Sequence, residues 1–255
     1  MKILSWDEFL RHGKNENSPS AATIGVFDGV HAGHRRLLEI VGDFAHGPSA
    51  EAGTGALVIT FRENPKKILR PKTYPGDILE FQEKLKKLEE AGMDTAVIID
   101  FSAELSKLKG TDFMSMVYEA CALRFLAIGE DFHFGWRLDT DALKARAFLE
   151  PRGVKVAILP SVYHDGMKIS STRIRDLIEE GNFRAAAAML GHPYRLTPRC
   201  KDGLRREQIG RVTPRKGSFP VVFEGSCGQR KGMLIAEDSG IFWHYDGEVE
   251  AITFL

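Results

Sequence analysis

The sequence predicts an α/β fold, a parallel β-sheet covered by helices, followed by a small module of β-structure. Over residues 21–160, short and fully apolar segments typical of buried parallel strands alternate with longer amphipathic segments typical of helices. Two further helix candidates, 171–181 and 182–191, each end in a glycine. Beyond Tyr194 the helical period disappears, and Gly, Pro and charged residues separate short β-prone pieces.

The elements follow one another in a β-α-β-α rhythm. The predicted strands are 21–26, 55–61, 95–100, 125–129 and 154–160, and the predicted helices between them are 34–45, 78–92, 111–122 and 140–153. Later β-prone pieces are 220–225, 231–237, 241–247 and 249–255. Ligands of such sheets bind at the carboxyl ends of the strands. We expect two domains, an α/β domain over 1–193 and a β-rich module over 194–255.

Composition narrows the class of protein. The 255 residues include 43% hydrophobic ones, enough for a sizeable core, and 35 basic residues balance 35 acidic ones. No overall field favours a nucleic-acid or membrane partner, and no apolar run has the length of a signal or a membrane span, so a soluble cytoplasmic protein is predicted. The cysteines, Cys121, Cys200 and Cys227, are too widely spaced to suggest a disulfide framework or a zinc site.

One segment is locally basic. Residues 195–216 contain eight Lys or Arg residues and two acidic ones. We interpret this segment as a solvated rim of the β module, with an RNA- or phosphate-binding surface as the alternative.

The stretch TIGVFDGVHAGH, residues 23–34, carries the first chemical pattern. A predicted strand ending in Phe27 meets a tight turn at Asp28 and Gly29, and Gly33 lets the backbone approach a ligand. A phosphate there would meet the open N–H groups and the positive dipole end of the following helix.

Two imidazoles belong to this turn. His31 and His34 are three residues apart and can both point at one phosphate, where they can donate hydrogen bonds to oxygens that gain charge as the phosphorus is attacked. A zinc site is disfavoured because no third ligand stands at ligand spacing nearby. Asp28 fits either a turn or a water-mediated magnesium contact.

A second pattern, KISSTRIRDLIEEG, occupies residues 168–181. Ser170, Ser171 and Thr172 stand at a helix start, where hydroxyls can cap the helix and contact phosphate oxygens. Arg173 and Arg175 are about 200° apart around a helix, so one is expected in the site and one at its edge. Together the two patterns could grip a nucleoside triphosphate at both ends.

These motifs resemble those of the FMN adenylyltransferase module of bacterial riboflavin kinase/FAD synthetases, which are α/β nucleotidyltransferases of the H-x-G-H type with a Rossmann-like fold. The resemblance rests on FDGVHAGH and ISSTRIR, and extends over residues 22–194. The further matching segments are Thr60-Phe61 with Pro65, GEDFHFG at 129–135 and GHPY at 191–194.

The resemblance implies the reaction of FMN with ATP to give FAD and pyrophosphate, with Mg²⁺ as cofactor. His31 and His34 would stabilise the transition state, and Ser171, Thr172 and Arg175 would hold the triphosphate. The other implied contacts are Gly25, Phe27, Asp28 and Gly33 for ATP, and Phe61, Asn64, Asp131 and Phe132 for the flavin. The magnesium ligands stay unassigned.

The sequence departs from the family pattern in two places near the flavin. Asn64 replaces a histidine of the family's T-F-x-P-H-P segment, and residues 136–143, WRLDTDAL, replace a Gly-rich loop ending in G-D. Asp141 is kept, but Thr140 stands in place of the glycine before it. These changes affect flavin recognition more than phosphate transfer.

The kinase half of the family is entered through a G-x-P-T-A-N segment, which residues 195–255 lack, since Pro220 is followed by Val221, Val222 and Phe223. This tail is also about half the expected length. We therefore expect no riboflavin kinase activity, and a tail that packs on the transferase or pairs subunits. A nucleotidyltransferase for another phosphate acceptor and a non-catalytic nucleotide- or RNA-binding regulator stay open as alternatives.

Overall fold

The structure of the protein is a computed structural model that describes residues 1–12 and 19–255. The described chain forms two compact units. The first unit contains Met1–Pro71 and Phe81–Val162, and the second contains Lys72–Glu80 and Tyr163–Leu255. Each unit is described by itself below, and the domain boundary near Pro193 stays a prediction.

The first unit is built on a parallel sheet, as predicted. Its six described strands lie in the order β1-β4-β3-β2-β5-β8, and every neighbouring pair is parallel. Their bounds are Lys2–Ser5 (β1), Pro19–Ile24 (β2), Gly55–Phe61 (β3), Thr95–Ile99 (β4), Ala122–Gly129 (β5) and Lys155–Leu159 (β8). The edge strand β1 was not expected, because it is short and half of it is exposed, which leaves no apolar run to detect.

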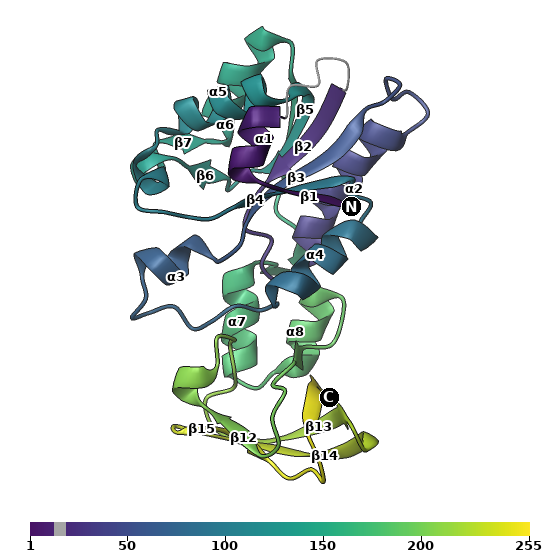
Figure 1. The fold of residues 1–255 in the computed structure, drawn as a ribbon, viewed down its shortest axis with the longest axis vertical. Coiled ribbons are helices and arrows are strands. Elements are labelled where there is room, and N and C mark those ends of the chain that lie inside the picture. Colours follow the sequence, from purple (N-terminus) through teal and green to yellow (C-terminus); the bar gives the residue numbers. More distant parts are fainter. Residues whose placement is uncertain (13–18) are drawn as a thin grey trace. The chain divides into compact units, whose positions relative to one another are not determined.

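Helices cover both faces of this sheet. They are α1 (Trp6–His12), α2 (Ala32–His46), α3 (Pro65–Leu69), α4 (Phe81–Glu90), α5 (Gly110–Ala120) and α6 (Ala142–Leu149). Figure 1 shows α1, α5 and α6 together on one side of the sheet, and α2 on the other, where it contacts β2, β3 and β5. Phe113, Met114 and Val117 of α5 are buried against the strands on their side, and Leu38 and Val41 of α2 are fully buried on theirs. The sheet is therefore buried on both faces, which explains the continuous apolar strands.

The strand order places a ligand crevice. From β2 the chain crosses to β3 on one side, and from β4 it returns to β5 on the other side of β2. In open α/β sheets the crevice outside the carboxyl ends of such strands is the usual binding site. The histidine motif follows β2 and GEDFHFG follows β5, so both begin at this point.

Short elements complete the first unit. They are the hairpin β6 (His133–Phe134) with β7 (Thr140–Asp141) and the 3₁₀ turns Leu105–Lys107, Trp136–Leu138 and Glu150–Arg152.

The second unit carries the expected β module, an antiparallel sheet in the order β11-β16-β13-β14-β15-β12. The strands are Arg195–Leu196 (β11), Gly203–Arg205 (β12), Gly217–Gly225 (β13), Gly228–Glu237 (β14), Gly240–Trp243 (β15) and Val249–Phe254 (β16), and Arg206–Gln208 forms a 3₁₀ turn. The helices are α7 (Ser171–Glu179) and α8 (Phe183–Leu190), preceded by the hairpin β9 (Tyr163–His164) and β10 (Met167–Lys168). Phe183 of α8 stacks on Phe254 at 4.0 Å between ring centroids, which anchors this helix to the sheet.

Segment 72–80 belongs to the second unit although its neighbours in sequence belong to the first. Asp77 pairs with Arg211 in an isolated parallel bridge, in which the N–H of Asp77 donates to Gly210 O at 3.0 Å. Gly76 has φ of 116°, and a Cβ there would stand 2.5 Å from the backbone carbon of Arg211. Only glycine fits this close approach.

Replacing Gly76 with alanine should therefore destabilise the second unit. The left-handed φ alone should lower the free energy of unfolding by about 1–3 kcal/mol, and the steric clash should lower it further. Gly210→Ala is the matched control, because a Cβ at Gly210 meets nothing within 4 Å. Denaturant unfolding of both variants measures the difference. Equal stability of the two variants would contradict the role given to Gly76.

Candidate active site

The turn between β2 and α2 is strained. Phe27 has φ of 53° and Val30 has φ of 37°, in the region that side chains with a Cβ rarely adopt, and Val30 is β-branched as well. Both side chains are buried, at 0% and 2% exposure. The N–H of Val30 donates to Phe27 O at 3.2 Å. Core packing and this hydrogen bond thus hold a conformation that the isolated segment would avoid.

His31 ends the turn and caps α2. It has extended backbone angles, and its Nδ1 accepts a hydrogen bond from the His34 N–H at 3.4 Å. Because Nδ1 is the acceptor, the neutral ring carries its proton on Nε2. The His31 and His34 rings stack with centroids 3.6 Å apart and planes 14° apart. The structure therefore brings the two predicted imidazoles into direct contact.

His34 lies against Phe27, with ring centroids 5.0 Å apart. Burial, followed by the charges of His31, Lys84 and Arg35, lowers the pKa of His34 well below its usual 6.5. The ring is therefore neutral at pH 7. Its Nδ1 is shielded from solvent and has no hydrogen-bond partner among the described residues. A buried lone pair without a partner costs less than a buried N–H, which places the proton on Nε2 as in His31.

Two glycines of the motif are needed for close packing. A Cβ at Gly33 would stand 3.3 Å from Cε1 of His31, and one at Gly25 would stand 3.1 Å from the Phe27 ring. Both positions were predicted as ATP contacts. In the structure they also leave room for the rings that shape the turn.

Sequence reasoning missed Lys84. This lysine of α4 is only 6% exposed, and its Nζ donates to Phe61 O at 2.6 Å and Val26 O at 3.4 Å. Leu85 and Leu88 share its buried side of the helix. A lysine beside two buried leucines is the signal that could have identified it, because lysine is rarely buried without a specific role.

The residues predicted at the flavin follow the two strands that flank β2. Phe61 ends β3 and Asn64 comes three residues later, while Asp131 and Phe132 follow β5. They therefore start from the same sheet edge as the histidine motif. Their contacts with a flavin stay a prediction.

Asn64 and Phe132 also have structural roles. Oδ1 of Asn64 accepts from the Lys66 N–H at 3.1 Å and so caps α3. Phe132 packs against the core of the sheet and lies 4.8 Å from the Phe134 ring. Asp131 is exposed, and its carboxylate accepts from Ser161 Oγ at 3.3 Å.

Segment 136–143 exposes three apolar side chains, whereas Thr140 and Ala142 within it are buried. Trp136, Leu138 and Leu143 are 41%, 64% and 68% exposed. Asp141 caps α6 by accepting from the Lys144 N–H at 2.8 Å, a hydrogen bond that lowers the pKa of this carboxyl. The aspartate that the sequence shares with the family thus has a capping role as well.

The second predicted motif lies in the second unit. Ser170 caps α7 by accepting from the Arg173 N–H at 3.2 Å, and Ser171 and Thr172 form the first turn of this helix. Arg175 is 5% exposed, and its Nε donates to Gly76 O at 2.9 Å.

The Arg175 guanidinium also lies over the Tyr74 ring, 5.3 Å from its centroid, and donates to the Tyr74 hydroxyl at 3.3 Å. In this structure Arg175 fastens segment 72–80. Its role toward a triphosphate stays a prediction, as do those of Ser171 and Thr172.

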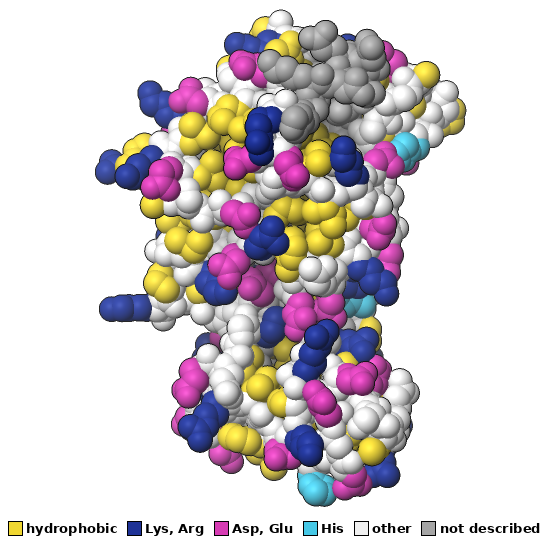
Figure 2. All heavy atoms as spheres, viewed as in Figure 1, with side chains coloured by type: hydrophobic (Ala, Val, Ile, Leu, Met, Phe, Trp, Pro, Cys, Tyr) yellow, Lys and Arg dark blue, Asp and Glu magenta, His cyan; other side chains and the backbone are white. Residues whose placement is uncertain are grey.

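The basic segment 195–216 makes many contacts within its own unit. Arg206 donates to the carbonyls of Pro214, Arg215 and Glu237. Further pairs are Arg195 with Glu224, Arg215 with Glu179, and Lys216 with Asp238. Figure 2 shows basic and acidic side chains interspersed on the face in view. These contacts favour the interpretation of the segment as a rim.

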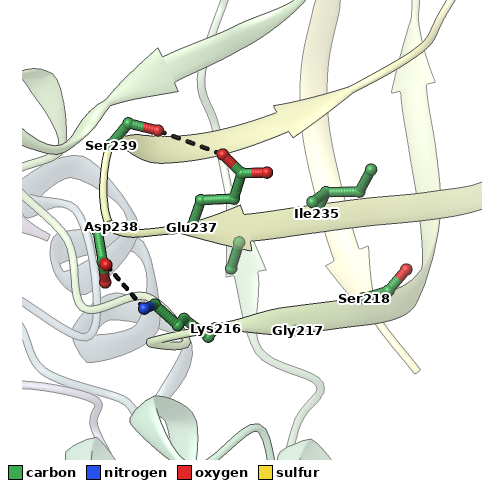
Figure 3. A pocket seen from close by; sticks show the side chains of 8 residues that line it. Lys216, Gly217, Ser218, Ile235, Glu237, Asp238 and Ser239 are labelled. Carbon is green, nitrogen blue, oxygen red and sulfur yellow. Dashed lines mark hydrogen bonds and ion pairs between the residues drawn. The ribbon is translucent and has the colours of Figure 1, made fainter.

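An open depression of about 580 Å³ lies in the second unit between the start of β13 and the end of β14 (Figure 3). Lys216 and Asp238 form an ion pair of 2.7 Å at its side, and Ser239 Oγ lies 3.5 Å from the Glu237 carboxylate. The lining residues are Lys216, Gly217, Ser218, Ile235, Ala236, Glu237, Asp238 and Ser239. None of them was predicted as a site residue.

Within residues 1–12 and 19–255 no three His, Cys, Asp or Glu side chains are grouped as a metal site would require. In the same ranges no helix is both long and apolar enough to cross a membrane. The cysteines are unpaired, and burial raises the pKa of the Cys121 thiol to about 12.

Comparison with known proteins identifies the family of the chain. The model of one family, described as FAD synthetase, matches residues 13–173. The chain belongs to the FAD synthetase family. The match covers the histidine motif after β2 and the beginning of α7.

Curated relatives of this FAD synthetase family member are longer. The bifunctional riboflavin kinase/FMN adenylyltransferase of Buchnera aphidicola (Acyrthosiphon pisum) is 29% identical over 200 residues, which is 78% of this chain and 62% of the relative. Its namesake from Escherichia coli K12 is 29% identical over 191 residues, which is 74% of this chain and 59% of the relative. The chain thus spans about three-fifths of the length of these relatives.

A solved structure is also similar. The crystal structure titled macrolide-efflux protein from Streptococcus pneumoniae has a TM-score of 0.78 and 25% sequence identity, over 100% of this chain and 90% of that one.

The pKa of His34 should make folding stability depend on pH. Its folded-state pKa is lowered, so the unfolded chain binds the proton more tightly, and stability present above about pH 6.5 is lost as the pH falls. His34→Gln should reduce the loss in the free energy of unfolding between about pH 7 and pH 5, measured by urea titration. His244→Gln, at a side chain 98% exposed, is the control. An unchanged pH slope in His34→Gln would show that His34 is not buried as described.

Proposed function

We propose that this chain is an FMN adenylyltransferase that transfers AMP from ATP to FMN, giving FAD and pyrophosphate. The observation that carries the proposal is the pair of stacked imidazoles at the start of α2, with ring centroids 3.6 Å apart. The family match and the names of the curated relatives support the substrate class.

The chemistry requires positioning and charge stabilisation. A phosphate oxygen of FMN attacks the α-phosphorus of ATP directly, pyrophosphate leaves, and no covalent enzyme intermediate is needed. Negative charge develops on the equatorial oxygens of the α-phosphate. The Nε2–H groups of His31 and His34 and the N-terminus of α2 are in place before the reaction begins. They can therefore stabilise the negative charge as it develops.

A neutral His34 suits this role. It donates a hydrogen bond without repelling the neighbouring His31 ring, whereas two stacked imidazolium ions would repel each other. Burial and the nearby cations that lower the pKa of His34 therefore keep this ring neutral at neutral pH.

Magnesium is implied by the family resemblance and is commonly held by substrate phosphates with one or two carboxylates. The described residues group no three ligands, so we assign none of them to the ion.

We further propose that residues 195–255 do not phosphorylate riboflavin. The segment Pro220–Phe223, which stands where the kinase motif would be sought, is part of β13 and pairs with β14 on one side and, from Val221, with β16 on the other. Val221 and Phe223 are buried. Purified protein that converts riboflavin and ATP to FMN would overturn this part of the proposal.

The decisive assay incubates the protein with ATP, Mg²⁺ and FMN and follows FAD by chromatography together with pyrophosphate release. His34→Ala should lower kcat by about 10²-fold, with a modest change in ATP binding, because one transition-state donor is lost. No FAD, but turnover with a pterin or cytidine-type acceptor, would refute FMN as the acceptor. An unchanged rate in His34→Ala would remove this residue from the site.

Gly33→Ala tests the space beside His31. The new methyl group would stand 3.3 Å from the His31 ring, so the ring must shift, and we expect kcat to fall about tenfold or more while α2 stays folded. Gly42→Ala is the control in the same helix, because a Cβ there meets nothing within 4 Å. Steady-state kinetics and circular dichroism compare the two variants. Equal rates would contradict the tight fit at Gly33.

A further inference from the structure

We propose that Lys84 is a positioning residue for the histidine pair. Its ammonium group donates to the Val26 carbonyl and so fixes the peptide between Val26 and Phe27. This inference rests on the proposed function. It assigns a role to a residue outside the motifs, on helix α4.

The first support is geometric. Nζ of Lys84 donates to Phe61 O at 2.6 Å and to Val26 O at 3.4 Å, so one cation ties together the chain at the ends of β2 and β3. Thr60 Oγ1 donates to the same Val26 carbonyl at 3.1 Å. This carbonyl therefore receives two donors from two different elements, which fixes the plane of the peptide.

That peptide plane sets the strained residue after it. The Val26 carbonyl belongs to the peptide whose nitrogen is that of Phe27, where φ is 53°. Releasing the carbonyl would allow the peptide to rotate and Phe27 to leave the left-handed region. The Phe27 ring packs 5.0 Å from the His34 ring, so its departure would also free His34 to move.

The far end of the turn is held in a comparable way. Nη1 of Arg35 donates to Val30 O at 3.3 Å, and Val30 is the second residue with a strained φ. Each strained residue thus has a cation on a carbonyl beside it. Lys84 comes from α4, whereas Arg35 belongs to α2 itself.

The second support is electrostatic. The titratable and charged groups near His34 are His31 on the turn, Arg35 on α2 and Lys84 on α4, and Asp28 is the carboxylate of the same turn. Lys84 is buried, so its charge is weakly screened and acts on the ring at short range. The same side chain can therefore hold the turn in shape and favour the neutral state of His34.

The experiment compares Lys84→Met, which removes the charge, with Thr60→Val, which removes only the neutral donor to Val26 O. Lys86→Met is the control on α4, since the Lys86 side chain is 76% exposed. For each variant we would measure kcat and KM for FAD formation, and titrate the His34 ring nitrogens by NMR in the ligand-free protein. Circular dichroism and urea unfolding show which variants are folded.

Lys84→Met should lower kcat about tenfold or more, change KM for ATP less than about threefold, and raise the pKa of His34. Thr60→Val should lower kcat less and leave the His34 titration unchanged. Lys84→Arg, which keeps the charge, should keep the titration close to that of the parent protein. Lys86→Met should match the parent in every measurement.

A folded Lys84→Met protein with unchanged kcat and unchanged His34 titration would overturn the proposal. If Lys84→Met does not fold, Lys84→Gln decides, because it removes the charge but keeps a neutral donor of shorter reach: an unchanged kcat together with an unchanged His34 titration in that variant would overturn the proposal. Failure of the proposed function is distinguishable: a parent protein that forms no FAD would refute that function. The His34 titration in Lys84→Met, which needs no substrate, would still support or refute the placement of Lys84.

Discussion

The strained turn between β2 and α2 is the constraint on which the site depends. Phe27 and Val30 adopt left-handed backbone angles, and they remain there because both side chains are buried and the carbonyls beside them receive hydrogen bonds from Lys84, Thr60 and Arg35. Strain of this kind persists only where the surrounding structure over-determines it. Its result is a helix start with two imidazoles stacked at 3.6 Å.

The sheet places this turn at the carboxyl end of a central strand, the usual ligand-binding position in open α/β sheets. Because β2 lies between β3 and β5, the segments after three neighbouring strands begin at one edge of the sheet. The histidine motif, Asn64 and Asp131 each follow one of these strands. Several of these residues cap helices or pack in the core as well, as Asn64 and Phe132 do. Side chains predicted to contact the flavin thus also stabilise the fold.

In the second unit, arginines act mainly as structural donors. Arg175 holds Gly76 and Tyr74, Arg206 holds three carbonyls, and Arg211 donates to the carbonyls of Asp77 and Arg195. A planar guanidinium with five N–H groups can satisfy several backbone carbonyls at once, which lysine cannot do in the same geometry. A count of basic residues therefore overstates the charge that this segment offers to a partner.

The sequence alone determined the local features of this protein. Apolar runs and glycines predicted the parallel sheet, the β module and the turn before α2, because strand burial and backbone freedom depend on residue type and spacing. Residue identity also singled out His31 and His34. Only the tertiary structure decided which polar groups are buried and with what partners. Lys84 donates to the Phe61 carbonyl, Asn64 caps α3, and Arg175 donates to Gly76 O in segment 72–80. It also decided that the partly exposed strand β1 pairs at the edge of the sheet. These outcomes depend on contacts between residues far apart in the chain, which no local pattern encodes.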